Sequence, residues 1–373
     1  MSANTGLEGV VVADTVLSLV DGEAGRLVIR GFELRELAGA CSYERALQIL
    51  LAGFVDEGVL AELPARLAAA RSEVFCSLQA LHEEQTLRVL PPIEALRALL
   101  ARLPDGDDDA TALRLIAAPA VFSAAIARAH RGQAPLAPAP GLGHAADLLR
   151  MMRGEDADAS EAAALETYLV TVLDHGLNAS TFAARVVAST RAGLSSAVIA
   201  ALSALKGPLH GGAPGPVLDM LDAIGRPELA SAWIDRELAS GARLMGFGHR
   251  IYRVRDPRAD ALRTALQSLE SAGSGARAAS TQARMKLAEA VERSALEALR
   301  RLKPERTLQT NVEFYTAVLL EALGFARDGF TCVFAVGRVA GWIAHAREQL
   351  RTGRLIRPQS HYVGPSPTPR QAA

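Results

Sequence analysis

The sequence has few of the features that mark disulfide-stabilised, metal-binding or membrane proteins. Its 373 residues include three cysteines, Cys41, Cys76 and Cys332, which lie far apart and form no C-x-x-C pair. Neither a disulfide framework nor a zinc site is therefore indicated, and without HExxH or another ligand spacing we expect no bound metal. The apolar run Leu194–Leu205 is too short to span a bilayer, which takes roughly 20 residues. Met1–Glu8 lacks the regions of a signal peptide, so we expect a cytoplasmic protein.

An excess of one charge and a large aromatic content are also missing. The 40 Lys and Arg balance the 41 Asp and Glu, and the net charge of −1 excludes a bulk attraction to nucleic acid or anionic lipid. Aromatic residues make up 5 %, while hydrophobic residues make up 50 %, which is ample for a sizeable core. Alanine and leucine dominate and favour helix over strand. We therefore predict an all-α fold.

The few departures from helical patterning are predicted to be a hairpin and loops. The β-rich runs Val16–Val20 and Arg26–Arg30 flank a glycine-containing turn and predict a small hairpin. Pro119 is expected to break or kink its helix. Ser268–Ser280 is predicted to be a loop between helices, and Pro365–Ala373 a disordered tail. Helices are predicted over Tyr43–Ala52, Pro64–Leu78, Leu96–Leu103, Ala112–Arg131, Glu161–Leu173, Ser180–Ser189 and Leu194–Leu205.

One glycine-rich segment places a histidine beside backbone amides. In Lys206–Pro216, His210 is followed by two glycines and by Pro214, which can open a helix. Amides in such a turn can polarise an anion or a carbonyl. The alternative is a glycine-rich connector with an incidental histidine.

A second segment, Gly246–Arg258, combines His249 with several arginines. Asp256 is predicted to be an N-cap and Pro257 the first residue of a helix. Arg258 then falls in the first turn, where a cation opposes the helix dipole, so an anionic partner is expected. The alternative is a solvated basic loop.

Two further charged side chains stand in apolar surroundings. Thr310 and Glu313 fit a capping box; alternatively, Glu313 is a carboxylate held at a helix start among apolar neighbours. Arg338 is the only charged residue of Phe330–Ala346. A buried arginine is rare unless it is paired, so Arg338 either pairs with a carboxylate of the fold or binds a ligand.

Together these segments resemble the citrate synthase family, and the resemblance covers almost the whole chain. The matching motifs occur in the family's order and spacing: Gly6–Gly9, Arg26–Phe32, Asp174–His175, Asn178–Thr181, Gly207–Gly212, Gly246–His249, Asp256–Arg258, Asn311–Tyr315, Gly337–Arg338, Gly341–Trp342, Arg357–Pro358 and Tyr362–Gly364. The resemblance implies an almost wholly helical homodimer with a minor N-terminal β-hairpin. It also implies a large domain over 1–212 and 325–373 and a small domain over 213–324, with the active site in the cleft between them.

The resemblance further implies a reaction of the tricarboxylic acid cycle, the condensation of acetyl-CoA with oxaloacetate to citrate and CoA. Acetyl-CoA is then a co-substrate, and no cofactor is bound permanently. By motif, His210 stabilises the enol of the thioester, Glu313 takes the proton from the acyl α-carbon, and His249 polarises the ketone of oxaloacetate. Also by motif, His175, Arg258 and Arg338 bind the carboxylates of oxaloacetate, and Arg357 reaches the same site from the other subunit. Arg253 is a candidate for binding the phosphates of CoA.

Two positions depart from the family pattern. The family's usual base is aspartate, whereas this chain has Glu313, and a misplacement of about 1 Å can cost roughly 100-fold in rate. Pro214 and Gly215 replace the usual asparagine and acidic residue after the His210 motif. The alternatives are a 2-methylcitrate synthase that uses propionyl-CoA, and a weakly active or non-catalytic homologue. Acetyl-CoA and propionyl-CoA differ by one methyl group, worth only about 1–3 kcal/mol in a pocket.

Overall fold

Helices dominate the chain, as predicted. The computed structural model describes residues 6–7, 9–80, 84–211, 214–273 and 275–365. The α-helices are α1 (Leu34–Leu37), α2 (Tyr43–Leu51), α3 (Glu57–Ala61), α4 (Leu63–Ala80), α5 (Glu84–Val89), α6 (Pro92–Leu100), α7 (Asp109–His130), α8 (His144–Arg153), α9 (Ala159–Thr171), α10 (Ala179–Ala188), α11 (Leu194–Leu205), α12 (Pro214–Ile224), α13 (Ala230–Ala239), α14 (Pro257–Ala272), α15 (Gly275–Leu302), α16 (Val312–Ala322) and α17 (Phe330–Thr352). Two short 3-10 turns, η1 (Pro227–Leu229) and η2 (Arg327–Gly329), complete the helical elements.

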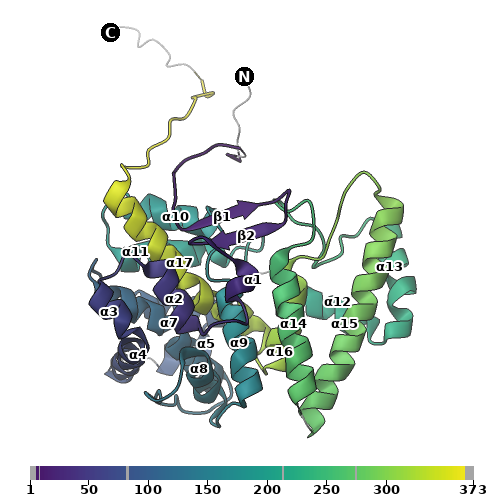
Figure 1. Cartoon of the computed structure of the whole chain (residues 1–373), viewed down its shortest axis with the longest axis horizontal. Coiled ribbons are helices and arrows are strands. Elements are labelled where there is room, and N and C mark those ends of the chain that lie inside the picture. The colour runs from purple at the N-terminus through teal and green to yellow at the C-terminus, as the bar shows by residue number, and fades with distance from the viewer. Residues whose placement is uncertain (1–5, 8, 81–83, 212–213, 274, 366–373) are drawn as a thin grey trace, which may run out of the picture.

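The predicted N-terminal hairpin is confirmed. Strands β1 (Ser18–Asp21) and β2 (Arg26–Ile29) pair antiparallel, and a third short strand, β3 (Phe32–Glu33), pairs with β2. The side chains of Leu17 and Leu27 are buried and anchor the sheet to the helices. The hairpin is therefore fixed to the core at its base, while its turn reaches toward the segment before α14 (Figure 1).

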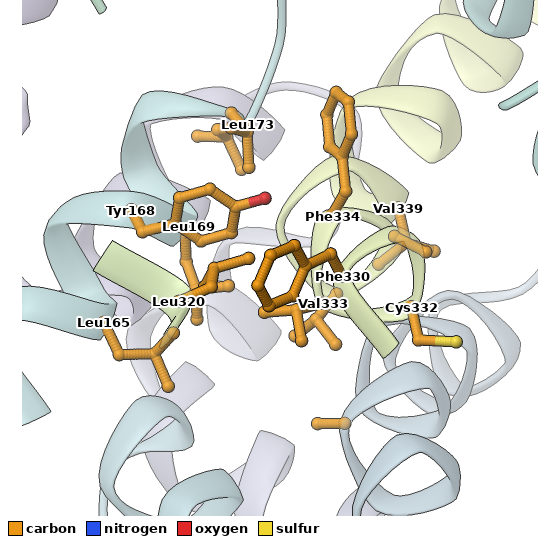
Figure 2. Packing of buried hydrophobic residues seen from close by; sticks show 14 of the residues in the cluster. Leu165, Tyr168, Leu169, Leu173, Leu320, Phe330, Cys332, Val333, Phe334 and Val339 are labelled. Carbon is orange, nitrogen blue, oxygen red and sulfur yellow. The ribbon is translucent and has the colours of Figure 1, made fainter. Parts of the chain in front are cut away.

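Helix α17 forms the centre of the core and packs against α2, α7, α9, α10 and α11. Figure 2 shows Leu165 and Leu169 of α9 and Leu320 of α16 close to Phe330 and Val333 at the start of α17. By length and composition alone, α7 and the segment Arg327–Thr352 could span a bilayer, whereas Leu194–Leu205 is shorter. However, 83 % and 89 % of their most apolar windows are buried inside the protein, as expected of core helices.

Two sequence-based expectations about local structure are wrong. Helix α7 continues through Pro119, so the expected break is wrong and a kink there stays a prediction; the surrounding residues are buried, and tertiary packing stabilises the helix. Most of Ser268–Ser280 is helical: α14 extends to Ala272 and α15 begins at Gly275. The alanines of this stretch favour helix, and burial of Leu269 holds the last turns of α14 against the protein. Most of the predicted disordered tail, residues 366–373, lies outside the described residues.

Helices α12, α13, α14 and α15 lie together on one side of the molecule (Figure 1). They meet the remaining helices where α14 packs against α9 and α16. The predicted domain boundary between residues 212 and 213 lies outside the described residues, so the division into a large and a small domain stays a prediction. The junction matters for function because the candidate site residues lie on the segments that meet there.

Candidate active site

His175 and His249 come together although 74 positions separate them in the sequence. His175 is buried in the loop after α9, and its ring centroid lies 5.7 Å from that of His249. Tyr252 contacts both rings, with its hydroxyl 3.1 Å from Nε2 of His175. Sequence reasoning did not select Tyr252, although it lies within the Gly246–Arg258 segment. Burial, followed by Arg258 and Arg338, holds the pKa of His175 well below its ordinary value, so its ring is neutral.

The backbone around His249 determines which ring nitrogen carries the proton. Its Nδ1 accepts hydrogen bonds from the amides of Ile251 and Tyr252, both at 3.0 Å. Nε2 therefore carries the proton of the neutral ring. Burial, and then the charge of Arg258, lowers the pKa of His249 to about 4. Nη2 of Arg258 lies 3.2 Å from Nε2 of His249, so the guanidinium and the ring are direct neighbours at this point.

The anionic partner expected for Arg258 is Asp256. Asp256 caps α14 by accepting the amide of Arg258, which confirms the predicted helix start. Its carboxylate also receives Nε and Nη2 of Arg258 at 3.0 and 2.8 Å, as a two-point ion pair. The same carboxylate accepts the amide of Val312 at 3.2 Å. Asp256 thus joins the start of α14 to the start of α16.

Arg338 has no such partner. It is 1 % exposed, and no carboxylate of the described residues lies within ion-pair distance of its guanidinium. Its Nε donates to the carbonyl oxygen of Val172, its guanidinium lies 5.0 Å from the ring centre of Phe334, and its buried Nη2 has no hydrogen-bond partner. Pairing with a carboxylate of the fold is therefore wrong for Arg338. Burial lowers its pKa to about 10, which leaves it charged at neutral pH.

Paired backbone segments place α16 beside His249. The amide of Gly248 donates to the carbonyl of Gln309 at 2.7 Å, and the amide of Asn311 donates to that of Gly246 at 3.0 Å. The side-chain amide of Asn311 also donates to the carbonyl of Gly248 at 2.8 Å. Gly246 has a φ of +83°, and a Cβ there would lie 2.8 Å from the ring of Phe314. This position therefore requires glycine both for its conformation and for the close packing.

Glu313 lies in the first turn of α16, but the predicted capping box is wrong. The N-cap is Asn311, whose side chain accepts the amide of Glu313, whereas Thr310 donates its hydroxyl to Glu292. No described residue donates a hydrogen bond to the Glu313 carboxylate. Burial raises its pKa to about 7; Arg258 opposes this shift and Asp256 adds to it. A carboxylate with such a pKa is suited to general-base chemistry near neutral pH.

His210 lies in the turn before α12, which begins at Pro214 as predicted. Its Nε2 is 2.8 Å from Oγ of Ser180, a hydroxyl that also contacts Oδ1 of Asn178 at 2.7 Å and receives the indole N–H of Trp342 at 3.1 Å. Burial, followed by Arg338 and Arg258, lowers the pKa of His210 to about 4. Gly212 and Ala213 of the same motif lie outside the described residues.

The sequence profile described as "Citrate synthase, C-terminal domain" matches residues 6–359. The chain belongs to the citrate synthase family. It is 36 % identical to the citrate synthase of Haloferax volcanii, with 96 % of this chain and 95 % of the relative covered. It is 35 % identical to a 2-methylcitrate synthase of Mycobacterium tuberculosis, with 96 % and 90 % covered. A solved ternary complex of carboxymethyl coenzyme A and oxaloacetate with the citrate synthase of Thermoplasma acidophilum has a TM-score of 0.81 and 27 % identity, with 97 % and 96 % covered.

The protein is a transferase of the citrate synthase type. Two of the residues predicted for its site, Arg253 and Arg357, do not lie among the buried histidines. Arg253 is exposed on the lining of a cleft of about 800 Å³ that also includes His249, Lys303 and Arg306. Arg357 lies in the extended, exposed segment that follows α17 and projects from the body of the protein (Figure 1). It makes no hydrogen bond or ion pair with any described residue.

Proposed function

We propose that the enzyme condenses acetyl-CoA with oxaloacetate to give citrate and CoA. The observation that carries this proposal is the buried guanidinium of Arg338, which has an unpartnered Nη2 and stays charged. A buried cation without a partner is costly, so its retention favours an anionic ligand. Neutral histidines and a carboxylate with a raised pKa accompany it, which suits acid–base chemistry on that ligand.

The two carboxylates of oxaloacetate would be bound mainly by arginine. Arg338 offers Nη2, and Arg258 retains donors that Asp256 does not occupy. Arginine suits this role because its forked donors match a carboxylate and remain charged. His175, next to Tyr252, would complete the site within one chain, and Arg357 would reach it from the partner subunit.

Enolisation of the thioester would require Glu313 and His210 to act together. Glu313 takes a proton from the acyl α-carbon, and the electron pair moves onto the thioester oxygen. His210 stabilises that oxygen by a hydrogen bond if Nδ1 carries its proton. This form requires the Ser180 hydroxyl to donate to Nε2 of His210, 2.8 Å away, in place of its hydrogen bond to Oδ1 of Asn178 at 2.7 Å.

Carbon–carbon bond formation would take place at His249. The enol carbon attacks the ketone carbon of oxaloacetate, and the ketone oxygen gains the electron pair. Nε2–H of His249 and Nη2–H of Arg258 are suited to stabilise that oxygen because the ring and the guanidinium are direct neighbours. Nε2–H of His249 gives its proton to the alkoxide, which yields citryl-CoA, and water carries the proton taken by Glu313 back to His249. Water then hydrolyses the thioester of citryl-CoA to release citrate and the free thiol of CoA.

The cleft beside His249 is the proposed site for the acyl-CoA co-substrate. Its basic residues, which include Arg253, Lys303 and Arg306, are suited to the phosphates of CoA. Its position next to His249 would direct the thioester toward the reacting groups. The bound carboxymethyl coenzyme A in the Thermoplasma acidophilum complex supports a CoA site in this family.

We further propose a homodimer. The N-terminal segment and the tail after α17 project from the same side of the protein (Figure 1). Both segments carry exposed apolar side chains. Val11 is 84 % exposed and Val363 87 % exposed. Exposed apolar surface of this kind is typical of interaction sites, and a second copy of the chain would bury it. The dimer would also give the isolated Arg357 a site in the partner.

The decisive assay follows release of free thiol after purified protein is mixed with oxaloacetate and either acetyl-CoA or propionyl-CoA. Faster release with acetyl-CoA supports the proposal, whereas a preference for propionyl-CoA supports the 2-methylcitrate synthase alternative. Arg338→Leu should abolish release, and Arg293→Leu, which removes an exposed arginine of α15, should not. Absence of thiol release with both acyl-CoA substrates would refute the proposal. Arg258→Leu is a poorer test because it leaves Asp256 buried without its ion-pair partner.

A further inference from the structure

The first strand of the hairpin holds the loop that carries His175. The Ser18 hydroxyl donates to Oδ2 of Asp174, and its oxygen accepts the amide of Gly176 at 3.0 Å. These two contacts fix the backbone on both sides of His175. One serine of β1 therefore holds this histidine in place.

The turn of the same hairpin holds the loop that carries His249. The carbonyl of Gly22 accepts the amide of Arg253 at 2.9 Å. A Cβ at Gly22 would lie 2.3 Å from the carbonyl oxygen of Ile251, so the turn and the loop are in direct backbone contact. Gly22 is only four residues from Ser18, and a paired strand of the sheet joins them.

The two loops held by the hairpin meet each other at the site. His175 from the first loop contacts the Tyr252 hydroxyl from the second at 3.1 Å. Ser18, the His175 loop, Tyr252 and Gly22 thus form a closed circuit of contacts through β1. A change at either hairpin residue is transmitted to the contact between the two loops.

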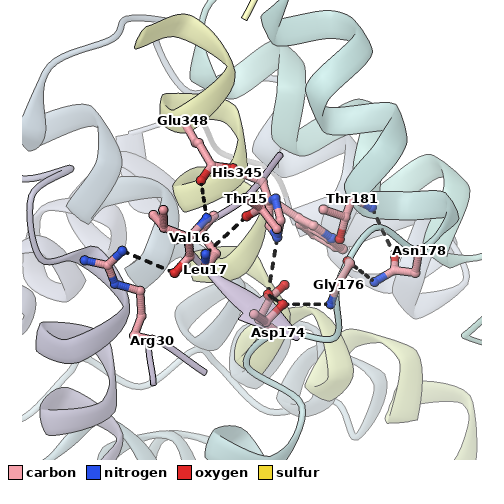
Figure 3. Close-up of polar contacts among 12 residues, drawn as sticks. Thr15, Val16, Leu17, Arg30, Asp174, Gly176, Asn178, Thr181, His345 and Glu348 are labelled. Carbon is pink, nitrogen blue, oxygen red and sulfur yellow. Dashed lines mark hydrogen bonds and ion pairs between the residues drawn. The ribbon is translucent and has the colours of Figure 1, made fainter. Parts of the chain in front are cut away.

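The base of the hairpin is fixed to the centre of the protein. The amide of Val16 donates to Glu348 of α17 at 2.9 Å, and Figure 3 shows this segment close to Asp174 and His345. His345 accepts Nη1 of Arg185 at its Nδ1, so Nε2 carries the proton and donates to Asp174 at 3.2 Å. All of these polar groups belong to one connected network. The hairpin is therefore a rigid support, not a loose N-terminal arm.

We propose that the β1–β2 hairpin is a positioning element of the oxaloacetate site, in which Ser18 and Gly22 set the separation between the His175 and His249 loops. This inference rests on the proposed binding of oxaloacetate. Neither Ser18 nor Gly22 is a catalytic residue, because each acts through the loop that it holds. The hairpin should affect oxaloacetate affinity more than acyl-CoA recognition, since the oxaloacetate site uses both loops whereas the cleft of Arg253 and Lys303 includes only the His249 loop.

The test compares two variants of the full chain with two matched controls. Gly22→Ala introduces the clash with Ile251, and Ser18→Ala removes the hydroxyl. Gly141→Ala is the control for the first, because a Cβ there meets nothing within 4 Å. Ser77→Ala is the control for the second, because Ser77 is partly exposed and its hydroxyl donates to the carbonyl of Glu73 in its own helix. Oxaloacetate affinity is measured by titration calorimetry, and backbone protection by hydrogen–deuterium exchange of peptides that contain Gly176 or Arg253.

We expect the dissociation constant of oxaloacetate to rise about tenfold in Gly22→Ala and Ser18→Ala. The KM of acyl-CoA should rise less than the dissociation constant of oxaloacetate, both controls should match the unmodified enzyme, and Ser18→Thr should restore affinity. Ser18→Ala should also speed exchange at Arg253, on the loop that Ser18 does not touch. Unchanged affinity, or unchanged exchange at Arg253, would overturn the proposal. If the unmodified protein binds no oxaloacetate, the proposed function fails, and the Arg253 exchange then decides alone whether the hairpin couples the loops. If Gly22→Ala does not fold, the Ser18 variants decide.

Discussion

Replacing Glu313 by glutamine should separate its catalytic role from its structural one. The change keeps the size of the side chain and removes the carboxylate that would take the proton from acyl-CoA. General bases contribute roughly 100- to 10,000-fold to rate, so thiol release should fall by that factor. Oxaloacetate binding should persist, because Arg258 and Arg338 remain. In the unmodified enzyme, kcat/KM for oxaloacetate should increase as pH rises through about 7, where Glu313 of the free enzyme loses its proton.

The same substitution should stabilise the protein at alkaline pH. Burial raises the pKa of Glu313 from 4.5 to about 7, so the folded state binds this proton more tightly than the unfolded state. The stability from this group is fully present below pH 4.5 and is lost as pH rises to 7. The difference between the two pKa values corresponds to a loss of roughly 3 kcal/mol in the free energy of unfolding above pH 7. Glutamine removes this loss, and the melting temperature at pH 8 should rise by roughly 4 °C.

The assay measures thiol release and thermal unfolding of Glu313→Gln at pH 5 and pH 8. Glu297→Gln, which changes an exposed carboxylate of α15, is the control and should alter neither quantity. A large fall in rate together with higher stability at pH 8 is the expected result. Near-native turnover would refute the assignment of Glu313 as the base. A lower melting temperature of Glu313→Gln than of the unmodified protein at pH 8 would refute the argument that the ionised Glu313 carboxylate destabilises the folded state.

Three further predictions follow from charged groups elsewhere. Arg338→Leu should weaken oxaloacetate binding about 10- to 100-fold without lowering the melting temperature, since it removes a buried charge that has no carboxylate partner in the described residues; calorimetry and thermal unfolding test this. Burial, together with Glu44, raises the pKa of Glu166 to about 7, so stability is lost between pH 4.5 and 7. Glu166→Gln should therefore resist denaturant better than the unmodified protein at pH 8 but not at pH 4, and equal stability at pH 8 would contradict this. Mixed dimers of Arg357→Ala and Glu313→Gln chains should regain activity if Arg357 serves the partner's site, whereas demonstrated heterodimers without activity would count against it.

The sequence was sufficient to predict features that depend on local patterns. β-rich runs around a glycine-containing turn predicted the β1–β2 hairpin, and an uncharged apolar run predicted α11 with both of its ends. The Asp256–Pro257 pair marked the start of α14, because an N-cap and a first-turn proline act within three residues. His175, Arg258 and Arg338 were selected from short motifs, and the structure brings them close to one another.

Features that depend on contacts between residues distant in sequence could not be predicted from local patterns. Thr310 has the spacing of a cap, but its hydroxyl donates to Glu292 on α15, which is distant in sequence. Asn311 takes the cap instead. Tyr252 was missed because its role follows from contact with His175, from a loop 77 residues away. The role of Ser18 likewise follows only from where the hairpin lies in the fold.

The charges of the site indicate that bound oxaloacetate should raise the pKa of Glu313, the proposed base. Arg258 and Arg338 both lower the pKa of Glu313, against the larger effect of burial. A bound dicarboxylate would neutralise these two cations, and the pKa of Glu313 should then rise above its value of about 7 in the free enzyme. A stronger base would thus be present only when the acceptor of the enol is already bound. The pH profile of kcat reports the substrate complex, and that of kcat/KM for oxaloacetate reports the free enzyme. We expect the kcat profile to reach its midpoint at the higher pH, and a midpoint equal to or below that of kcat/KM would show that the two arginines do not couple oxaloacetate binding to the base.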